Sequence, residues 1–301
     1  MVLRTALLFQ THFFDRGSAE VFDQLRCQVP EGFEASVLIH LPPGAPVPER
    51  LKGVPHHIAR TPELRHPAYP TKCGGADWKL YEHGHTDLIL LHFARARPDY
   101  DRYWIVEYDV RFSGDWRRFF AAFEAEEADL ITPVLYRRVD LPERSGWAWP
   151  ESGDLETGAA PLQFVWPQPS LPPERQFCAF MPIYRVTRAG LAAVDAAWRA
   201  GWAGHSEAVW PTAIAEAGLR LLDPGGDGPF TPPELRGRFY TCTPTGEVLS
   251  PGTLCFKPPL YGPGMRPDML WHPVKPLWTP ELHRAVRELR VCVVGEILSQ
   301  P

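Results

Sequence analysis

The N-terminal part of the chain alternates between apolar runs of strand length and a helical pattern, and this alternation limits the fold more than any other feature. Arg4–Gln10 and Ala35–Leu41 are short apolar runs, each bounded by polar or proline residues. Between them, Ser18 can cap a helix that continues to about Cys27 with one apolar face. A strand, a helix and a second strand in this order are typical of an α/β sheet with parallel neighbouring strands.

The same alternation continues along the chain. Further strands are expected at Val54–Ala59, Tyr103–Val106, Leu130–Leu135 and Phe177–Val186. Further helices are expected to begin at Thr86 or Asp87, at Asp115, at Thr187, at Ser206 (with Pro211 in its first turn) and at Thr279. We therefore predict a single α/β domain over residues 1–301, with a Rossmann-like, mostly parallel mixed sheet flanked by helices and long loops rich in Pro and Trp.

The composition excludes some classes of function. The chain has 31 Lys and Arg against 36 Asp and Glu, so it lacks the basic excess that a nucleic-acid binder needs. Its 34 prolines and 24 glycines predict many long, stiff connections. No apolar run is long enough to span a bilayer, and Met1–His12 lacks the long apolar region of a signal peptide. The six cysteines are scattered without zinc-type spacing, which favours reduced thiols and a cytoplasmic location.

The most informative segment is Trp104–Trp116, in which an apolar strand ends in alternating charges. Because side chains two positions apart on a strand share a face, Glu107, Asp109 and Arg111 are expected on one side of the sheet edge. Open α/β sheets bind their ligands at this carboxyl edge. Two carboxylates there can hold a divalent cation, and a guanidinium can bind phosphate oxygens. Taken by itself, the pattern also fits an ion-paired strand end.

With this segment the layout resembles the GT-A-fold glycosyltransferases, which use nucleotide-sugar donors, and in particular an uncharacterised fungal and bacterial glycosyltransferase-like group. In that family an Asp-x-Asp-type motif at a strand end meets the donor diphosphate, usually through Mn²⁺ or Mg²⁺. The resemblance implies that Glu107 and Arg111 bind the diphosphate, and that Asp109 is a catalytic and metal-binding residue. The motif here is Glu-x-Asp or Asp-x-Arg, so a metal-independent site with positive charge from Arg111 and Lys275 stays open.

Two later segments extend the resemblance. Gly204–Glu207 is similar to the family's acidic helix start, which implies that Glu207 deprotonates the acceptor hydroxyl in an inverting reaction. Trp271–Lys275 resembles a late loop that supplies a histidine ligand to the metal or a lysine to the diphosphate, which implies these roles for His272 and Lys275. A glutamate that favours the helix dipole and an ordinary surface loop are the structural alternatives.

Three further residues are candidates for donor binding. Thr11 and His12 follow the first strand, where nucleotides contact this class of sheet, and they are expected to bind the base or ribose. Lys72 can reach a phosphate, although its surroundings lack the spacing of a P-loop. Structural roles remain the alternatives for these residues.

Two features lie in segments that carry no motif of the family. Trp147, Trp149 and Trp166 occupy a long loop and are candidates either for stacking on sugar rings or for core packing. The expected last helix has a basic ridge, which suits peripheral contact with an anionic membrane or a solvated helix face. The ridge consists of Arg284, Arg287 and Arg290.

Together these features predict a glycosyltransferase of polysaccharide biosynthesis. Residues 1–135 would form its nucleotide-binding half, and residues 136–301 the acceptor-side half with the C-terminal helix. Its partners would be a nucleotide-sugar donor and a glycan or another hydroxyl acceptor. Two other classes stay open: a non-catalytic nucleotide- or glycan-binding relative, and a phosphate-ester enzyme with two cations about 4 Å apart.

Overall fold

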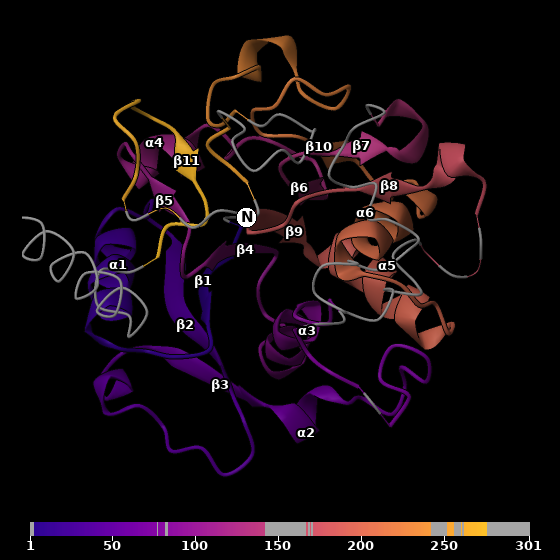
Figure 1. Ribbon diagram of the computed structural model, residues 1–301, viewed down its shortest axis with the longest axis horizontal. Helices are drawn as coiled ribbons and strands as arrows, with labels where there is room; N and C mark the ends of the chain where they lie inside the picture. The colour runs from indigo at the N-terminus through magenta and orange to yellow at the C-terminus, as the bar shows by residue number, and fades with distance from the viewer. Residues whose placement is uncertain are drawn as a thin grey trace, which may run out of the picture.

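The structure is a computed structural model (Figure 1). It describes residues 3–76, 78–81, 84–141, 167, 169, 171–241, 252–255, 260 and 262–275. Among these residues, seven strands form the main sheet, in the order β10–β6–β9–β4–β1–β2–β3. The strands are β1 (Thr5–Thr11), β2 (Phe33–Leu41), β3 (His56–Arg60), β4 (Arg102–Glu107), β6 (Leu130–Ile131), β9 (Ile183–Thr187) and β10 (Leu221–Leu222).

The strand directions make this a mixed, mostly parallel sheet. The central strand β1 pairs in parallel with β2 and β4, and β2 pairs in parallel with β3. Strand β9 runs antiparallel to its neighbours β4 and β6, whereas β10 is parallel to β6. The predicted fold class, an α/β fold with a mixed, mostly parallel sheet flanked by helices, is confirmed. Because β9 runs in reverse, the residues before it lie at the edge where β1 and β4 end.

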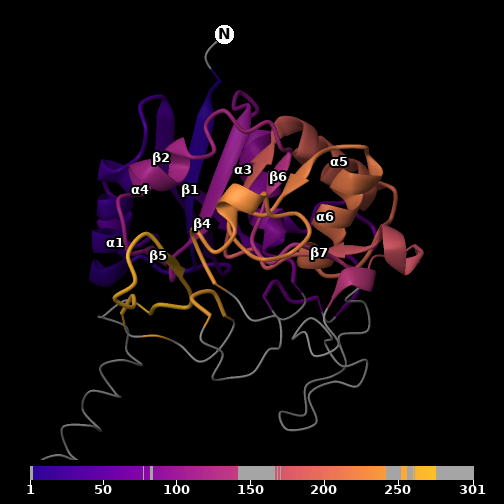
Figure 2. The ribbon, with the colours of Figure 1, turned by 90° about the horizontal axis from the view of Figure 1, so that it is seen from above.

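Helices cover both faces of the sheet. They are α1 (Arg16–Cys27), α2 (Thr61–Leu64), α3 (Asp87–Ala96), α4 (Trp116–Ala121), α5 (Arg188–Arg199) and α6 (Ser206–Glu216). The apolar side chains of α1 and α4 join one core cluster, and those of α3, α5 and α6 join the other. Figure 2 shows α1 and the α5–α6 pair on opposite sides of the molecule.

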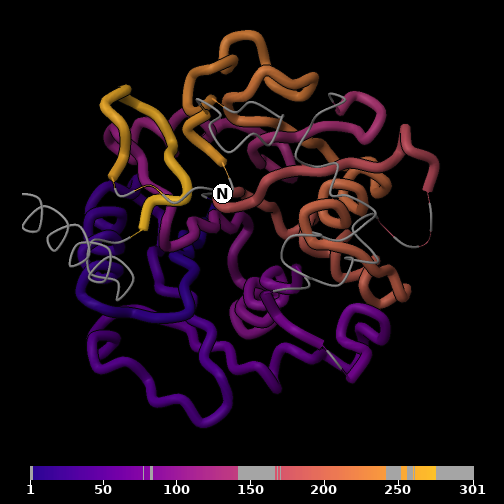
Figure 3. The backbone as a smooth tube through the Cα atoms, in the orientation of Figure 1, coloured from indigo at the N-terminus to yellow at the C-terminus, as the bar shows by residue number. Residues whose placement is uncertain are grey.

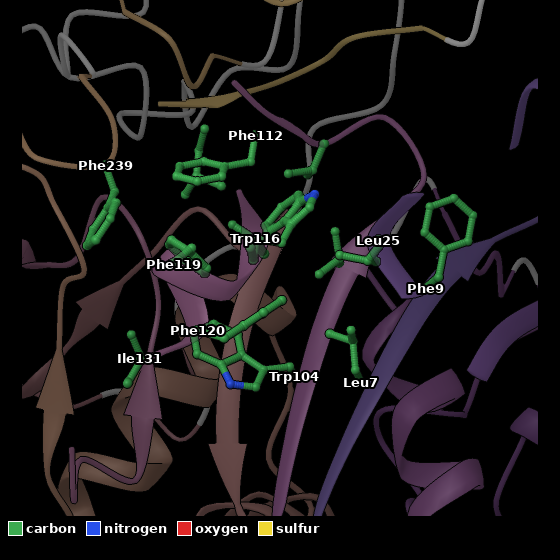
Figure 4. Close-up of a cluster of buried hydrophobic side chains, with 14 of the residues drawn as sticks. Leu7, Phe9, Leu25, Trp104, Phe112, Trp116, Phe119, Phe120, Ile131 and Phe239 are labelled. Atoms are coloured by element: carbon green, nitrogen blue, oxygen red, sulfur yellow. The ribbon is translucent and has the colours of Figure 1, made fainter. Parts of the chain in front are cut away.

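The pleat of the central strand supplies both clusters. Leu7 and Phe9 enter the cluster on the α1 side, and Ala6 and Leu8 enter the other. Figure 4 shows the first cluster, in which aromatic rings of α4 pack against Trp104 of β4. Burial on both faces explains why this strand is a continuous apolar run rather than an alternating one.

Several predicted boundaries shift for identifiable reasons. Helix α1 begins earlier than expected, because the Asp15 side chain accepts from the Ser18 amide at 2.8 Å and is the actual N-cap. The expected strand at Leu130–Leu135 ends at Ile131, shortly before Pro133, which has no N–H for the ladder. The expected strand at Phe177–Val186 is divided by Pro182 for the same reason. The caps at Asp115 and Thr187 are confirmed.

Two small sheets complete the described structure. Strands β7 (Tyr136–Arg137) and β8 (Phe177–Cys178) pair in one, and β5 (Arg111–Phe112) pairs antiparallel with β11 (Leu270–Trp271) in the other. The second pairing brings the end of the described chain, yellow in Figure 3, next to the segment that follows β4.

Some expectations fall outside this description. The last helix from Thr279, with its basic ridge, and the three loop tryptophans lie outside the described residues. No helix in the described part of the chain is long and apolar enough to cross a membrane. The described cysteines are free thiols, as expected; they are Cys27, Cys73, Cys178 and Cys255.

Candidate functional site

Strand β4 ends at Glu107, and the chain turns there instead of continuing as a strand. The Val110 amide donates to the Glu107 carbonyl at 3.0 Å and closes a turn. The expected pleat, with Glu107, Asp109 and Arg111 on one strand face, is therefore wrong. Glu107 lies at the end of the strand, and the turn that follows carries Asp109 at the same carboxyl edge of the sheet.

Arg111 faces the backbone of this turn. Its Nη1 donates to the carbonyl oxygens of Tyr108 and Val110, each at 2.8 Å. Burial lowers the pKa of the guanidinium to about 10, although nearby Asp109 acts in the opposite direction. Arg111 thus holds the turn that carries Asp109, and its contact with a phosphate stays a prediction.

The segment around β11 docks onto this turn. The Val274 amide donates to the Asp109 carbonyl at 2.7 Å. Lys275 Nζ then lies 2.8 Å from Asp109 Oδ2 and 2.9 Å from the Tyr108 hydroxyl oxygen. The structure therefore brings His272 and Lys275 to the carboxyl end of β4, although more than half of the sequence separates them from it.

His272 presents a ring nitrogen to the two acids. Its Nδ1 lies 2.8 Å from the Cys255 carbonyl oxygen, which can only accept, so Nδ1 carries the hydrogen. Burial lowers the pKa of His272, although Asp109 opposes this shift, so the neutral ring is favoured. Its Nε2 lone pair then lies 3.5 Å from Asp109 Oδ1 and 3.8 Å from Glu107 Oε2.

These three side chains fit a divalent cation. One ligand atom from each of Glu107, Asp109 and His272 lies within 4.8 Å of the others. Asp109 Oδ1 is buried and has no hydrogen-bond partner, so it is available to a ligand. Two carboxylates and an imidazole are ligand types that divalent cations take in proteins. The Nδ1–H bond of His272 also matches the support that metal-binding histidines receive.

The charges of the site are unevenly compensated. Burial, together with the carboxylates of Asp109 and Glu207, raises the pKa of Glu107 well above its usual range. Burial disfavours the charge of Lys275, but Asp109 and the Tyr108 hydroxyl outweigh this and raise its pKa. The ammonium of Lys275 therefore pairs with Asp109. The negative charge of Glu107 has no such partner and can be neutralised by a proton or a cation.

Glu207 reaches the same edge from the first turn of α6. Its Oε1 accepts from the Met181 amide at 2.9 Å, and the carbonyl of the next residue, Pro182, accepts from the Glu107 amide at 2.9 Å. The segment just before the reversed strand β9 thus hydrogen-bonds to both glutamates and holds them near each other. Burial raises the pKa of Glu207 to about 8, despite the hydrogen bond from Met181, which lowers it.

A proline inside α6 fixes the backbone of Glu207. Pro211 lies within the helix rather than in its first turn, so that expectation is wrong. Since proline has no N–H, it leaves a carbonyl one turn earlier without its helical partner. That carbonyl belongs to Glu207 and accepts from the Ala179 amide at 2.9 Å. Both the main chain and the side chain of Glu207 are therefore tied to the segment before β9.

Thr11 and His12 lie at the end of β1. The Thr11 hydroxyl donates to the Phe13 carbonyl at 2.7 Å. The exposed His12 ring meets the edges or faces of Phe13, Tyr81 and Tyr108, with ring centroids 4.9–5.7 Å apart. These rings lie beside the acidic site, because Lys275 also contacts Tyr108. Base or ribose binding by Thr11 and His12 stays a prediction.

Sequence reasoning missed three members of this ring group, Phe13, Tyr81 and Tyr108. Tyr108 lies inside the acidic segment, so its position between Glu107 and Asp109 was a usable signal. No sequence signal pointed to Tyr81. Its hydroxyl lies 2.8 Å from Nδ1 of His40, which comes from the end of β2. The contact joins residues far apart in the sequence.

Lys72 is not brought to this site. Its Nζ is buried and lies 3.0 Å from the Gly84 carbonyl oxygen and 3.1 Å from Asp87 Oδ1. Burial lowers the pKa of Lys72, and Asp87 opposes this shift. The ammonium is therefore enclosed by protein groups, and its contact with a phosphate stays a prediction.

No family model matches the chain, and no curated protein matches it. Among solved structures, 157 chains match. One is the inositol-1-phosphate CTP transferase from T. maritima, which is 10% identical with a TM-score of 0.36; the match covers 78% of this chain and 93% of that chain. At these values the likeness assigns no activity or substrate to this chain.

Proposed function

We propose that this chain is a transferase for nucleotide-activated substrates, and specifically a glycosyltransferase that moves a sugar from a nucleotide-sugar donor to a hydroxyl acceptor. The observation that carries the proposal is the convergence of Glu107, Asp109, His272 and Lys275 at the carboxyl edge of a mostly parallel α/β sheet. A group with excess carboxylate beside an ammonium suits a metal–diphosphate ligand, which brings both cationic and anionic charge.

The diphosphate would bind over the acidic turn. Glu107, Asp109 and His272 would hold Mn²⁺ or Mg²⁺, which when bound supplies positive charge to the phosphate oxygens. Lys275, about a third exposed, would donate from Nζ to an oxygen of the departing diphosphate and stabilise its developing charge. The base and ribose would lie over Thr11 and His12, where the neighbouring rings offer flat surfaces for stacking.

Glu207 would act as the base. The acceptor oxygen forms a bond to the anomeric carbon as the bond from that carbon to the diphosphate oxygen breaks, and the electron pair leaves with the diphosphate. The hydroxyl proton passes to the Glu207 carboxylate. A pKa of about 8 makes Glu207 a stronger base than an ordinary carboxylate, at a pH where part of it is ionised. A single displacement of this kind inverts the anomeric configuration.

A thermal-shift screen across nucleoside diphosphates, with and without Mn²⁺, tests donor binding. A ligand that binds only the folded protein at 100 times its Kd stabilises it by about 2.7 kcal/mol. We expect one nucleotide to stabilise the wild-type protein in a Mn²⁺-dependent way, and Asp109→Asn to remove the shift. Asp23→Asn, an exposed partner of Arg26, is the matched control. The absence of any shift in folded wild-type protein would contradict the proposal.

Turnover separates the proposal from its alternatives. Release of nucleoside diphosphate from a nucleotide sugar, lost in Glu207→Gln, supports the transferase. Binding without release would favour the non-catalytic nucleotide- or glycan-binding relative. In the described residues, one group of three ligands converges within 4.8 Å, which supports one cation rather than the pair expected of a two-metal phosphate-ester enzyme.

A further inference from the structure

The buried ammonium of Lys72 belongs to a closed polar centre between three helices. Its Nζ lies 3.1 Å from Asp87 Oδ1 and 4.3 Å from the ring centroid of Trp198. Asp87 Oδ2 accepts from the indole N–H groups of Trp198 and Trp210, at 3.1 and 2.9 Å. These residues come from α3, α5 and α6, so the centre fixes the three helices relative to one another.

The same ammonium reaches the start of α6 through Gly84. The Gly84 carbonyl accepts from Lys72 Nζ at 3.0 Å and from the Ser206 amide at 3.3 Å. Ser206 is the first residue of α6, and Glu207 is the second. Lys72 is thus two hydrogen bonds away from the helix turn that carries Glu207.

Gly84 also supports the residue that caps this helix. Gly84 has a φ of +64°, and a Cβ built there would lie 2.1 Å from Cδ2 of the His205 ring. His205 is the N-cap of α6, and its Nδ1 accepts from the Glu207 amide at 3.3 Å. The ring therefore packs directly on the Gly84 backbone while it holds the Glu207 amide.

We propose that Lys72 and Gly84 are positioning residues that set the place of the Glu207 carboxyl through Ser206 and His205. The proposal deepens the proposed function, because it rests on Glu207 as the base. Met181 and Ala179 hold Glu207 from one side. The contacts from Lys72 through Gly84 to Ser206 and His205 hold it from the other. The charge of Lys72 also acts on His205: burial, and after it Lys72, lowers the pKa of His205 to about 4, so its Nδ1 remains an acceptor.

The physical cost of the centre supports this role. A buried ion pair pays for desolvation and is often no more stabilising than apolar residues of the same volume. Two Asp87–indole bonds would survive with a neutral partner in place of Lys72. What the ammonium adds is a fixed donor for the Gly84 carbonyl, and that carbonyl lies against the helix start.

Gly84→Ala tests the positioning directly, with Gly53→Ala as its matched control. Both glycines have positive φ, +64° and +76°, but a Cβ at Gly53 meets nothing within 4 Å. We expect Gly84→Ala to shift the titration midpoint of the Glu207 carboxyl by one pH unit or more, measured by NMR of ¹³C-glutamate-labelled protein and assigned with Glu207→Gln. Gly53→Ala is expected to leave that midpoint unchanged. Equal titrations in both variants would overturn the proposal.

A double variant tests Lys72 without leaving a buried charge. Lys72→Met with Asp87→Asn removes both charges, and we expect a folded protein whose Glu207 titration is still shifted. A wild-type titration in this folded variant would overturn the role of Lys72. The readout needs no turnover: full transferase activity in Glu207→Gln would contradict the proposed base, while a shifted titration would still support the positioning.

Discussion

Two lysine–aspartate pairs in this protein differ in how completely the fold surrounds them. In the Lys72–Asp87 pair the side chains are 0% and 2% exposed. Two indole N–H groups donate to Asp87 Oδ2 and a carbonyl accepts from Lys72, while the buried Asp87 Oδ1 faces only the ammonium and has no hydrogen-bond partner. In the Lys275–Asp109 pair Lys275 is 33% exposed, and Asp109 keeps one buried oxygen without a hydrogen-bond partner. The distances are similar, 3.1 and 2.8 Å.

The difference shows which pair is built to receive a ligand. The Lys72–Asp87 pair is closed to solvent, so a ligand could reach it only by displacing protein groups. The Lys275–Asp109 pair has an open oxygen that faces the His272 nitrogen, and a lysine that solvent reaches. The surroundings of each pair, rather than its residue types, therefore indicate a structural role for one and a ligand-binding role for the other.

Replacing each lysine with methionine should give the largest difference between the two pairs, in the free energy of unfolding. Lys72→Met leaves Asp87 buried without its counter-charge, and we expect a loss of about 3–5 kcal/mol in the free energy of unfolding. Lys275→Met removes a partner that is a third exposed but leaves the buried Asp109 beside His272 and solvent, so we expect a smaller loss than for Lys72→Met. Urea denaturation of both variants measures the difference, with exposed Lys52→Met as the control. Similar losses for Lys72 and Lys275 would break the comparison.

Much of the fold could be predicted because its signals are local. The apolar run of β1 and the cap at Asp115 are determined by neighbouring residues, and both are present. The partners of Lys72 come from residues 84, 87 and 198, so nothing in the sequence around it distinguishes a phosphate ligand from a core residue. The approach of His272 to Asp109 depends on the pairing of β5 and β11, strands of two residues each.

Glu207 extends the comparison to a buried acid whose carboxyl contacts the Met181 amide and the His205 ring rather than a lysine. Its pKa in the folded protein is about 8, against 4.5 for the ordinary group. A raised pKa contributes stability that is present at low pH and is lost as the pH rises toward the folded value. Between about pH 5 and pH 7 the unfolding free energy should fall by about 1.4 kcal/mol per pH unit from this group.

Glu207→Gln should therefore flatten this pH dependence and stabilise the protein near pH 8, while it abolishes transfer. Denaturation at several pH values measures the slope, and Glu216→Gln at the other end of α6, where the residue pairs with Arg175, is the matched control. A slope that persists unchanged in Glu207→Gln would assign the titration to another group, such as Glu107.

The smallest predicted effect concerns metal affinity. The Lys275 ammonium lies 2.8 Å from Asp109 Oδ2, so it repels a cation bound to the same carboxylate. Lys275→Met should tighten Mn²⁺ binding about fivefold to tenfold while it weakens binding of the nucleoside diphosphate, whereas His272→Ala should weaken Mn²⁺ binding. Calorimetric titration with Mn²⁺ alone measures the metal affinity of both variants, and a separate titration with the nucleoside diphosphate measures its binding. Weaker Mn²⁺ binding in Lys275→Met would show that the lysine instead holds Asp109 in place for the metal, as Lys72 is proposed to hold Gly84 for Glu207.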